Sequence, residues 1–394
     1  MSWQELCLSE VCSFENGDRG KNYPGKSALL DEGMPFVNAG DLEEGMLRVN
    51  GLSYISLSHY QRLSNGKFSE GDFLFCLRGS LGKFAFVDRA IEGAIASSLI
   101  IIRPRTGLHP GYLKHYLASD LCSKEIASYA NGAAQPNLAA SSLKQFKIPL
   151  PPFDKQKQIA AILDKADQLR QKRRQAIALL GSLTQSIFLE MFGEPVSNPR
   201  GFAVKELQEI VDPDRKITYG ILMPGPDVPD GVPYVRVVDM RDGLVLVDQL
   251  RRTTSEIAKE YRRSSLRAGD LLVSIRGHVG RLAVTPPKCG GANITQDTAR
   301  LAIAGANPLY VSALLSTSEA QHWMSQRTKG VAVRGINLGD LKKFPVMLPA
   351  ISEQNDFARQ VEQKLKVLQL KEAQLNSSES LFCSLQHRAF TGQL

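Results

Sequence analysis

The stretch IPLPPFDKQKQIAAILDKADQLRQKR (Ile148–Arg173) marks an abrupt change in composition, from Gly- and Pro-rich sequence to helix-forming sequence. A second stretch of the same kind, VMLPAISEQNDFARQVEQKL, covers Val346–Leu365. From Asp154 to Met191 and from Ser352 to Ala389 there is no proline, and Gly181 is the single glycine. Because proline and glycine are the strongest helix breakers, both segments are predicted to be long helices.

The two helical segments are 198 positions apart, and so is most of the remaining sequence. MPFVNAGDLEEG (Met34–Gly45) corresponds to VPYVRVVDMRDG (Val232–Gly243), and GDFLFCLRGSLGKFA (Gly71–Ala85) to GDLLVSIRGHVGRLA (Gly269–Ala283). Since twice 198 nearly equals the 394 residues of the chain, the sequence is read as a tandem duplication.

Short apolar runs separated by turn signals precede each helix, as in DFLFCL, FAFV, SLIIIRP and LLVSI. These runs predict strands, with one helix in each region starting at Pro110 and Pro308. We therefore predict that the chain has four segments: a β-rich domain over residues 1–150, a helical spacer over 151–195, a second β-rich domain over 196–349 and a second spacer over 350–394.

Both long helices carry apolar residues at heptad spacing. The first places Ile159, Ala166, Leu180 and Ile187 at one heptad position, with Arg173 interrupting the series, and Ile162, Leu169, Ala176 and Leu183 at the other. The second repeats Val361, Leu368, Leu375 and Phe382 every seven residues. We therefore expect an α+β protein in which the two helices pair as an antiparallel coiled coil with pseudo-two-fold symmetry.

Composition limits the functional classes. The chain carries 48 Lys and Arg against 40 Asp and Glu, a net charge of +8, which is compatible with nucleic-acid binding without establishing it. We expect no signal peptide and no membrane-spanning run. The six cysteines form no C-x-x-C pair, which argues against a zinc site and fits a reducing cytoplasm.

Several motifs resemble catalytic sites but lack essential parts. GSLGK (Gly79–Lys83) lacks the spacing of a phosphate-binding loop, and its counterpart GHVGR ends in Arg281, so both are predicted to be tight turns between strands. NPLY (Asn307–Tyr310) resembles the tetrad of adenine methyltransferases, but its counterpart is HPGY and no cofactor loop accompanies it. The histidines show no metal-ligand spacing. We expect the chain to have no catalytic residues and no metal site.

The order of these elements resembles one protein family along essentially the whole chain. A β-rich domain followed by a proline-ended strand and a long helix, twice over, is similar to the specificity (S, or HsdS) subunits of type I restriction–modification systems. GDxLxxxRGxxG, GAAQPNL (Gly132–Leu138) and GVAVRGINL (Gly330–Leu338) are typical of their target-recognition domains. The second copy departs from the pattern at Ala350, Asn355 and Asp356.

The resemblance implies a cytoplasmic, non-catalytic subunit that binds double-stranded DNA and holds two methyltransferase subunits, joined by two restriction subunits. Each recognition domain would read one half of a split, asymmetric site, and the helical pair would fix the gap. S-adenosylmethionine would be bound by the methyltransferase subunits, and ATP and magnesium by the restriction subunits, with no cofactor on this chain.

Candidate DNA-reading residues follow from comparing the two halves. Arg78 and Arg276 are shared, so they are assigned either to DNA phosphates or to bracing the turn through Asp72 and Asp270. Residues that differ between halves are better candidates for base contacts, because two different half-sites require different side chains. These are Ser80, Lys83, Gln135 and Asn137 in the first half, and His278, Arg281, Arg334 and Asn337 in the second.

The partner-docking candidates lie on the helices: Ile159, Ile162, Leu169, Arg173, Val361, Leu368 and Leu375. The basic run RQKRR (Arg170–Arg174) is interpreted as solvated or partner-facing. Two other functions remain open from sequence: a DNA-binding protein that acts without enzymatic partners, and a coiled-coil scaffold whose β-rich domains bind protein or glycan.

Overall fold

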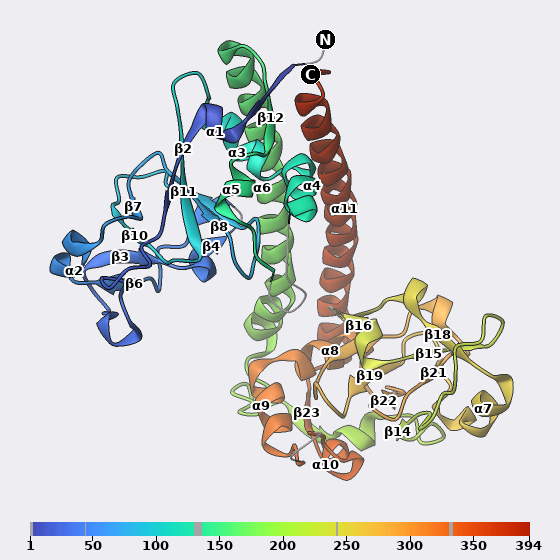
Figure 1. Cartoon of the computed structure of the whole chain (residues 1–394). Coiled ribbons are helices and arrows are strands. Elements are labelled where there is room, and N and C mark those ends of the chain that lie inside the picture. Colours follow the sequence, from blue (N-terminus) through green and yellow to red (C-terminus); the bar gives the residue numbers. More distant parts are fainter. Residues whose placement is uncertain (1–2, 44, 130–135, 242, 331–333) are drawn as a thin grey trace. The chain divides into compact units, whose positions relative to one another are not determined.

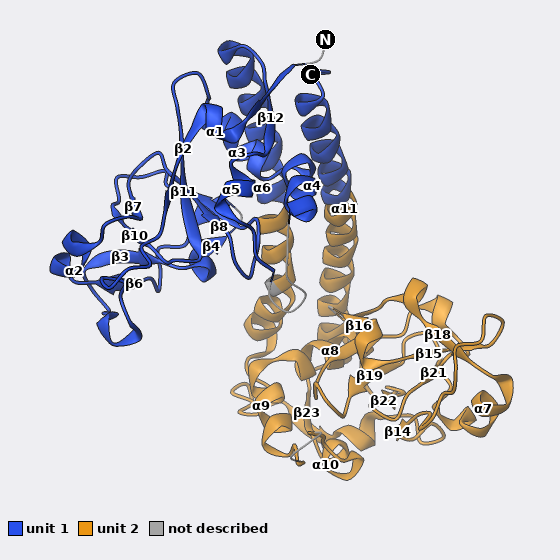
Figure 2. Cartoon of the chain, viewed as in Figure 1, with its two compact units in different colours: residues 1–173, 374–394 blue, residues 174–373 orange. Residues whose placement is uncertain are grey.

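A computed structural model describes residues 3–43, 45–129, 136–241, 243–330 and 334–394. The chain divides into two compact units, which Figure 2 shows in different colours. Unit 1 comprises Met1–Arg173 and Gln374–Leu394, and unit 2 comprises Arg174–Ala373. Each unit therefore contains one β-rich domain together with a part of each long helix.

Unit 1 contains the first β-rich domain (Figure 1). A six-stranded sheet has the order β2-β11-β8-β9-β5-β4, a four-stranded sheet has the order β6-β3-β10-β7, and β1 pairs with β12. The strands are β1 (Gln4–Cys7), β2 (Cys12–Asn16), β3 (Met34–Val37), β4 (Leu42–Glu43), β5 (Gly45–Leu47), β6 (Ser53–Ile55), β7 (Lys67–Phe68), β8 (Phe73–Cys76), β9 (Phe84–Phe86), β10 (Gly93–Ile95), β11 (Leu99–Pro104) and β12 (Lys147–Leu150). The short helices are α1 (Leu8–Val11), α2 (Leu57–Arg62), α3 (Pro110–Leu117), α4 (Asp120–Tyr129) and α5 (Ala140–Leu143).

Unit 2 repeats this plan with a four-stranded sheet, β14-β22-β19-β20, a three-stranded sheet, β18-β15-β21, and the pairs β13-β23 and β16-β17. Its strands are β13 (Ala203–Glu206), β14 (Thr218–Tyr219), β15 (Val232–Val235), β16 (Met240–Arg241), β17 (Leu244–Val245), β18 (Arg251–Thr253), β19 (Leu271–Ser274), β20 (Leu282–Val284), β21 (Asn293–Ile294), β22 (Thr298–Leu301) and β23 (Pro345–Leu348). Its short helices are α7 (Ser255–Glu260), α8 (Pro308–Ser316), α9 (Ser318–Gln326) and α10 (Leu338–Lys342).

The two long helices are α6 (Phe153–Phe192) and α11 (Ile351–Phe390), at the predicted positions and again 198 residues apart. Gly193 and Gly392 follow them with positive φ angles of 77° and 76°, the left-handed conformation that commonly ends a helix. The starts of α3 and α8 at Pro110 and Pro308 also agree with the sequence prediction. The prediction of one helix per β region was too low, because α4 and α9 follow directly.

Within each unit, α6 and α11 run antiparallel. In unit 1, Arg173 Nη1 donates to the Gln374 carbonyl at 2.7 Å, and the Arg170 guanidinium lies 3.8 Å from the centroid of the Phe382 ring. In unit 2, Lys364 Nζ donates to Thr184 Oγ1 at 2.8 Å, while Phe188 packs against Phe357 with ring centroids 5.6 Å apart.

The contact face of α6 differs in part from the prediction. Ile159 is buried and Ala166 half-buried, as expected, but Ile162 is 41% exposed and Leu169 46% exposed. The second contact row lies one residue later, at Leu163, Arg170, Ile177 and Thr184. Two of these residues, Arg170 and Thr184, are polar, so the spacing of apolar residues alone predicted the neighbouring row that contains Ile162 and Leu169. On α11 the predicted series holds: Val361, Leu368 and Phe382 are buried and Leu375 is half-buried.

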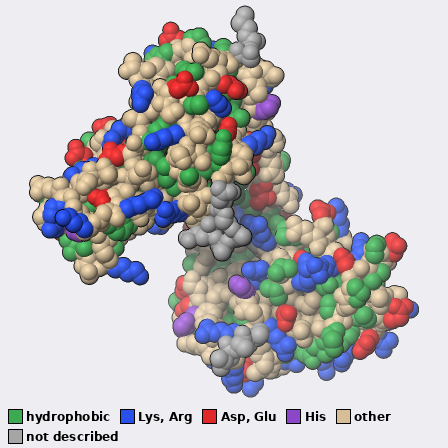
Figure 3. All heavy atoms as spheres, viewed as in Figure 1, with side chains coloured by type: hydrophobic (Ala, Val, Ile, Leu, Met, Phe, Trp, Pro, Cys, Tyr) green, Lys and Arg blue, Asp and Glu red, His purple; other side chains and the backbone are tan. Residues whose placement is uncertain are grey.

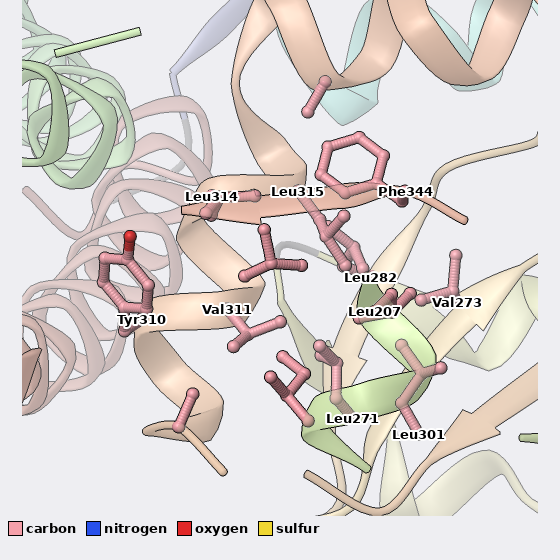
Figure 4. Packing of buried hydrophobic residues seen from close by; sticks show 14 of the residues in the cluster. Leu207, Leu271, Val273, Leu282, Leu301, Tyr310, Val311, Leu314, Leu315 and Phe344 are labelled. Carbon is pink, nitrogen blue, oxygen red and sulfur yellow. The ribbon is translucent and has the colours of Figure 1, made fainter. Parts of the chain in front are cut away.

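Each β-rich domain is fused to its helices by an aromatic and aliphatic core. Figure 4 shows part of the core of unit 2, in which Tyr310 and Leu314 of α8 belong to the same buried cluster as Leu271 and Leu301 of the sheet. Phe188, Phe192 and Phe357 of the long helices belong to the same buried cluster. In unit 1 the corresponding cluster joins Tyr112 and Tyr116 of α3 to Phe382 and Phe390 of α11. The helices are therefore part of each domain's core.

A buried glutamine fixes the start of each long helix to the preceding domain. In unit 1, Gln156 accepts a hydrogen bond from His109 N at 2.8 Å and donates to the carbonyls of Gly107 and Pro151. In unit 2, Gln354 accepts from Asn307 N at 2.9 Å and donates to the Pro349 carbonyl at 2.9 Å.

A stretch of α6 reaches a mean hydropathy of 1.2 over 18 residues, so by length and composition the helix could cross a membrane, contrary to the sequence expectation. Such composition is weak evidence, because a helix packed in a soluble core passes the same test. Here Phe188 and Phe192 of α6 are fully buried against α8 and α11. Only 12% of the apolar stretch is buried, so these contacts account for part of its apolar composition.

Replacing Gln156 with Ala is expected to lower the free energy of unfolding by about 1–3 kcal/mol, because His109 N and two carbonyls lose their partner in a buried site. Urea denaturation of the full chain measures this. Gln158→Ala, at an exposed position two residues later, is the control and should change stability by less than about 0.5 kcal/mol. Equal losses in the two variants would show that the glutamine contacts contribute nothing specific.

Candidate nucleic-acid interface

The turn that follows β8 has the same backbone construction as the turn that follows β19. Both connect antiparallel strands, and their glycines have positive φ: Gly79 and Gly82 in unit 1, and Gly277 and Gly280 in unit 2. Side chains other than glycine rarely adopt this conformation, which explains why these glycines occur in both copies. The prediction of tight turns, in place of phosphate-binding loops, is confirmed.

The shared aspartates brace these turns, but their partners are other than Arg78 and Arg276. Asp72 accepts hydrogen bonds from Ser69 N and from Arg103, whose Nε lies 2.8 Å from Asp72 Oδ1. Asp270 accepts from Arg267 N and binds both terminal nitrogens of Arg215, at 2.8 and 2.7 Å. The bracing role predicted for Arg78 and Arg276 through these carboxylates is therefore wrong, and both arginines are exposed.

A second loop pairs with each turn at equivalent positions. Arg78 forms a β-bridge with Asn137, and Arg276 forms one with Gly335, exactly 198 residues on. Gly79 N donates to the Pro136 carbonyl at 3.0 Å, and Gly277 N to the Arg334 carbonyl at 2.9 Å. Backbone hydrogen bonds thus hold the two loops together without constraining the side chains at their surfaces.

This register corrects one comparison made from sequence. Asn137 corresponds to Gly335, whereas Asn337 corresponds to Ala139, the residue that precedes α5. Asn337 instead caps α10: its Oδ1 accepts from Asp340 N at 2.8 Å, and its Nδ2 donates to Asp340 Oδ2 at 2.6 Å. Its side chain therefore already has a structural role. Gln135 lies outside the described residues.

In unit 2 the turn and the loop border a cleft of about 740 Å³. Its lining combines two cations, Arg276 and Lys329, with the amides of Gln296 and Asn337. Tyr219, Asp297, Ile275, Gly335, Ile336 and Leu338 complete it. Arg276 Nη1 lies 3.5 Å from Gln296 Oε1, a long hydrogen bond, and the Arg276 side chain is exposed.

Arg334 and Arg281 lie elsewhere on unit 2. Arg334 lines a neighbouring hollow of about 430 Å³ with Gly277 and His322. Arg281 is half-buried, donates from Nη1 to the Val237 carbonyl at 3.0 Å, and lines a groove between the domain and the long helices. His278 is exposed at the tip of the turn, and its carbonyl accepts from Ser274 Oγ.

In unit 1, Arg78, Ser80 and Lys83 are all exposed on the turn, with Asn137 beside Arg78. Figure 3 shows Lys and Arg side chains distributed over the displayed face of each unit, among apolar and acidic ones. The interface is therefore defined by local geometry and does not coincide with one uniform basic patch.

The side chains of the catalytic look-alike motif NPLY have structural roles in the described residues. No group of three or more His, Cys, Asp or Glu side chains that could hold a metal ion occurs in the described part of the chain. In the NPLY sequence, Asn307 caps α8 by accepting from Leu309 N and Tyr310 N, and Tyr310 is buried, donating to the Met347 carbonyl at 2.9 Å. Tyr112 does the same with Pro149 at 2.7 Å, and burial raises the pKa of both tyrosines.

The family model for the type I restriction modification DNA specificity domain matches residues 1–179 and 199–380. The chain belongs to this family. It is 27% identical to the EcoBI specificity subunit of Escherichia coli and 24% identical to the EcoKI specificity subunit of Escherichia coli K12, in both cases over 100% of this chain and 86% and 89% of the relative.

Two solved structures share the specificity-subunit fold. A chain from a study of complex assembly and conformational transition in a type I R-M system matches with a TM-score of 0.63 and 20% identity, covering 100% of this chain and 98% of that one. The S subunit of the type I system from M. genitalium matches with a TM-score of 0.57 and 14% identity, covering 99% and 96%. The predicted family and fold class are confirmed.

Sequence reasoning missed Tyr219, Gln296 and Lys329 in the cleft. Lys329 lies five residues before Arg334 in the same loop and could have been included with it. Tyr219 and Gln296 come from segments that only the strand topology brings beside the turn, through the pairing of β14 with β22 and the bridge between Ile221 and Thr295.

Two arginines on one turn provide a matched test of the cleft. We expect Arg276→Ala to weaken DNA binding by about 1–3 kcal/mol, the usual effect of removing a base-contacting arginine. Arg281→Ala removes the same charge from the groove beside the helices and should have a clearly smaller effect. Fluorescence anisotropy at fixed salt measures both. If Arg281→Ala is as damaging as Arg276→Ala, the cleft is not the principal contact.

Proposed function

We propose that this chain is the DNA-sequence-recognition subunit of a type I restriction–modification complex. In this role each β-rich domain reads one half of a bipartite, asymmetric site on double-stranded DNA. The chain itself performs no chemistry and works in the cytoplasm.

The proposal depends on one observation: the turn and its paired loop have the same backbone contacts in both units but expose different side chains. The turn and loop make the same backbone contacts in both units, at Arg78–Asn137 and Arg276–Gly335. On this shared frame the exposed side chains differ: Ser80 corresponds to His278, and Pro136 corresponds to Arg334. Two readers on one scaffold with different surface chemistry suit a site whose halves differ in sequence.

The cleft of unit 2 supplies the chemistry that base reading requires. Arg276 and Lys329 can donate to guanine O6 and N7, Gln296 can form paired hydrogen bonds with adenine, and Asp297 can accept from cytosine N4. The same cations can neutralise phosphates, which supplies affinity without sequence preference. A glycan site would need neither the second cation nor the duplicated frame.

Methyltransferase subunits are proposed to dock on the long helices. Among the predicted docking residues, Ile159, Val361 and Leu368 are buried in contacts within their own unit. Arg173 is used to bind the Gln374 carbonyl of α11. Ile162 and Leu169 remain exposed, one heptad apart on α6, and offer an apolar surface of the kind that a partner helix covers.

The complex would contain two methyltransferase subunits, which bring S-adenosylmethionine, and two restriction subunits, which bring ATP and magnesium. The helices would set the gap between half-sites, because a helix advances about 1.5 Å per residue and resists bending over its length.

Co-expression with the cognate methyltransferase subunit tests the proposal. The wild-type chain should form a two-to-one complex that methylates adenines in a split motif. Ile162→Glu with Leu169→Glu should abolish co-purification, because two carboxylates would be buried without partners. The same double variant should still bind DNA by itself, since neither residue belongs to a β-rich domain.

Gln168→Glu adds a carboxylate at an exposed position of the same helix and should leave the complex intact. A double variant that co-purifies normally would contradict docking at this surface. A wild-type complex that forms but methylates no split motif would contradict the recognition role.

A further inference from the structure

The loop between β14 and β15 in unit 2 exposes two neighbouring aliphatic side chains. Met223 is 82% exposed, more than any other large apolar side chain in the described part of the chain, and Leu222 is 45% exposed. Isolated apolar residues on a surface are common, but an adjacent pair at the tip of a loop places a contiguous apolar surface in water.

The loop is anchored at its first end. Ile221 is fully buried; its N donates to the Ile294 carbonyl at 2.7 Å, and its carbonyl accepts from Gln296 N at 2.8 Å. A Cβ at Gly220 would lie 1.8 Å from the Ile294 carbonyl oxygen, so only glycine allows this close approach of the two backbones.

The loop is also anchored just beyond the tip. The Pro224 carbonyl accepts from Thr253 Oγ1 at 2.7 Å, and Gly225 turns the chain with a φ of +72°. Leu222 and Met223 are thus presented by a short segment that is fixed on both sides, which lowers the entropy cost of placing them in a ligand.

The same contacts place the tip beside the polar cleft. Gln296, whose backbone binds Ile221, lines the cleft together with Arg276 and Lys329. Tyr219, three residues before Leu222, lines it too. A ligand in the cleft would therefore meet two cations, one carboxylate, amides, a phenol ring and aliphatic side chains, with the exposed pair at the margin.

This combination matches DNA better than a protein partner. Proteins that kink DNA insert Leu, Met, Ile, Phe or Pro between base steps while nearby cations bind the flanking phosphates. A protein interface would be expected to surround the aliphatic pair with further apolar residues. Five of the ten residues that line the neighbouring cleft instead carry a charge or an amide: Arg276, Gln296, Asp297, Lys329 and Asn337.

Unit 1 has a different loop at the corresponding place. Tyr23 packs edge-to-face on Phe36, with ring centroids 6.0 Å apart, and Asn22 Nδ2 donates to the Arg62 carbonyl at 2.9 Å. No pair of exposed aliphatic residues projects from the described residues of this loop. Among the described residues of the two loops, the exposed aliphatic pair therefore occurs in unit 2 and not in unit 1.

We propose that Leu222 and Met223 form a wedge that enters the base stack at the half-site bound by unit 2, unstacking one base step there and not in the other half-site. The inference rests on the proposed DNA-reading function.

The test uses the full chain and a duplex enriched by it from a random DNA pool, with 2-aminopurine placed singly at positions in and beside each half-site. Unstacking raises the fluorescence of this base. We expect a several-fold rise at one step of a single half-site on binding of the wild-type chain.

Leu222→Ser with Met223→Ser should remove this rise while sequence-specific binding persists with affinity reduced by about tenfold or less. Val238→Ser, at a 65% exposed apolar position of unit 2 next to the Val237 carbonyl that binds Arg281, should keep the rise. These three results together support the wedge.

A rise that persists in the double variant, or a bound wild-type complex without a rise at any position, overturns the wedge and leaves the recognition function standing. Failure of the wild-type chain to enrich any sequence overturns the recognition function, and the wedge with it.

Discussion

A buried glutamine at the start of each long helix connects it to the preceding β-rich domain. Gln156 and Gln354 occupy equivalent positions. Each accepts a hydrogen bond from the backbone N–H of the residue before α3 or α8 and donates one to the carbonyl of the proline that follows β12 or β23. Because the glutamine satisfies several buried backbone groups at once, the helix cannot rotate or slide against its domain without leaving them unpaired. These contacts fix each β-rich domain to the start of its following helix, as the proposed role of the helices in positioning a DNA-reading surface requires.

The two copies share the backbone of the turn but differ in the side chains that brace it and that it exposes. Asp72 and Asp270 keep the same turn but bind cations from different segments, Arg103 on β11 and Arg215 before β14. Burial alone would lower the pKa of Arg103, but the hydrogen bonds that it donates to Asp72 and Glu15 outweigh this effect and raise the pKa, so the guanidinium stays charged. The frame is thus preserved by chemistry that does not depend on which side chains the turn presents. That independence would allow one scaffold to carry two different recognition surfaces, as the proposed function requires.

Much of this architecture could be predicted from sequence because it is local or repeated. The long helices follow from the absence of proline, and the turns from glycines repeated 198 residues apart. The contact row of α6 could not be located from apolar spacing, since Arg170 and Thr184 occupy it and are held by Phe382 and Lys364 of α11. Only some of the residues that line the cleft could be predicted. Tyr219 and Gln296 come close to the turn through strand pairing between segments distant in sequence, and no local sequence pattern indicates that pairing.

The most direct measurement is selection of double-stranded DNA from a random pool by the full chain and by a variant in which residues 1–150 are exchanged for those of another member of the family. The wild-type chain should enrich two unlike half-sites separated by a constant gap, and the exchanged chain should alter one half-site and keep the other half and the gap. An unsplit motif, or a change in both half-sites on exchanging one domain, would contradict the assignment of one half-site to each unit.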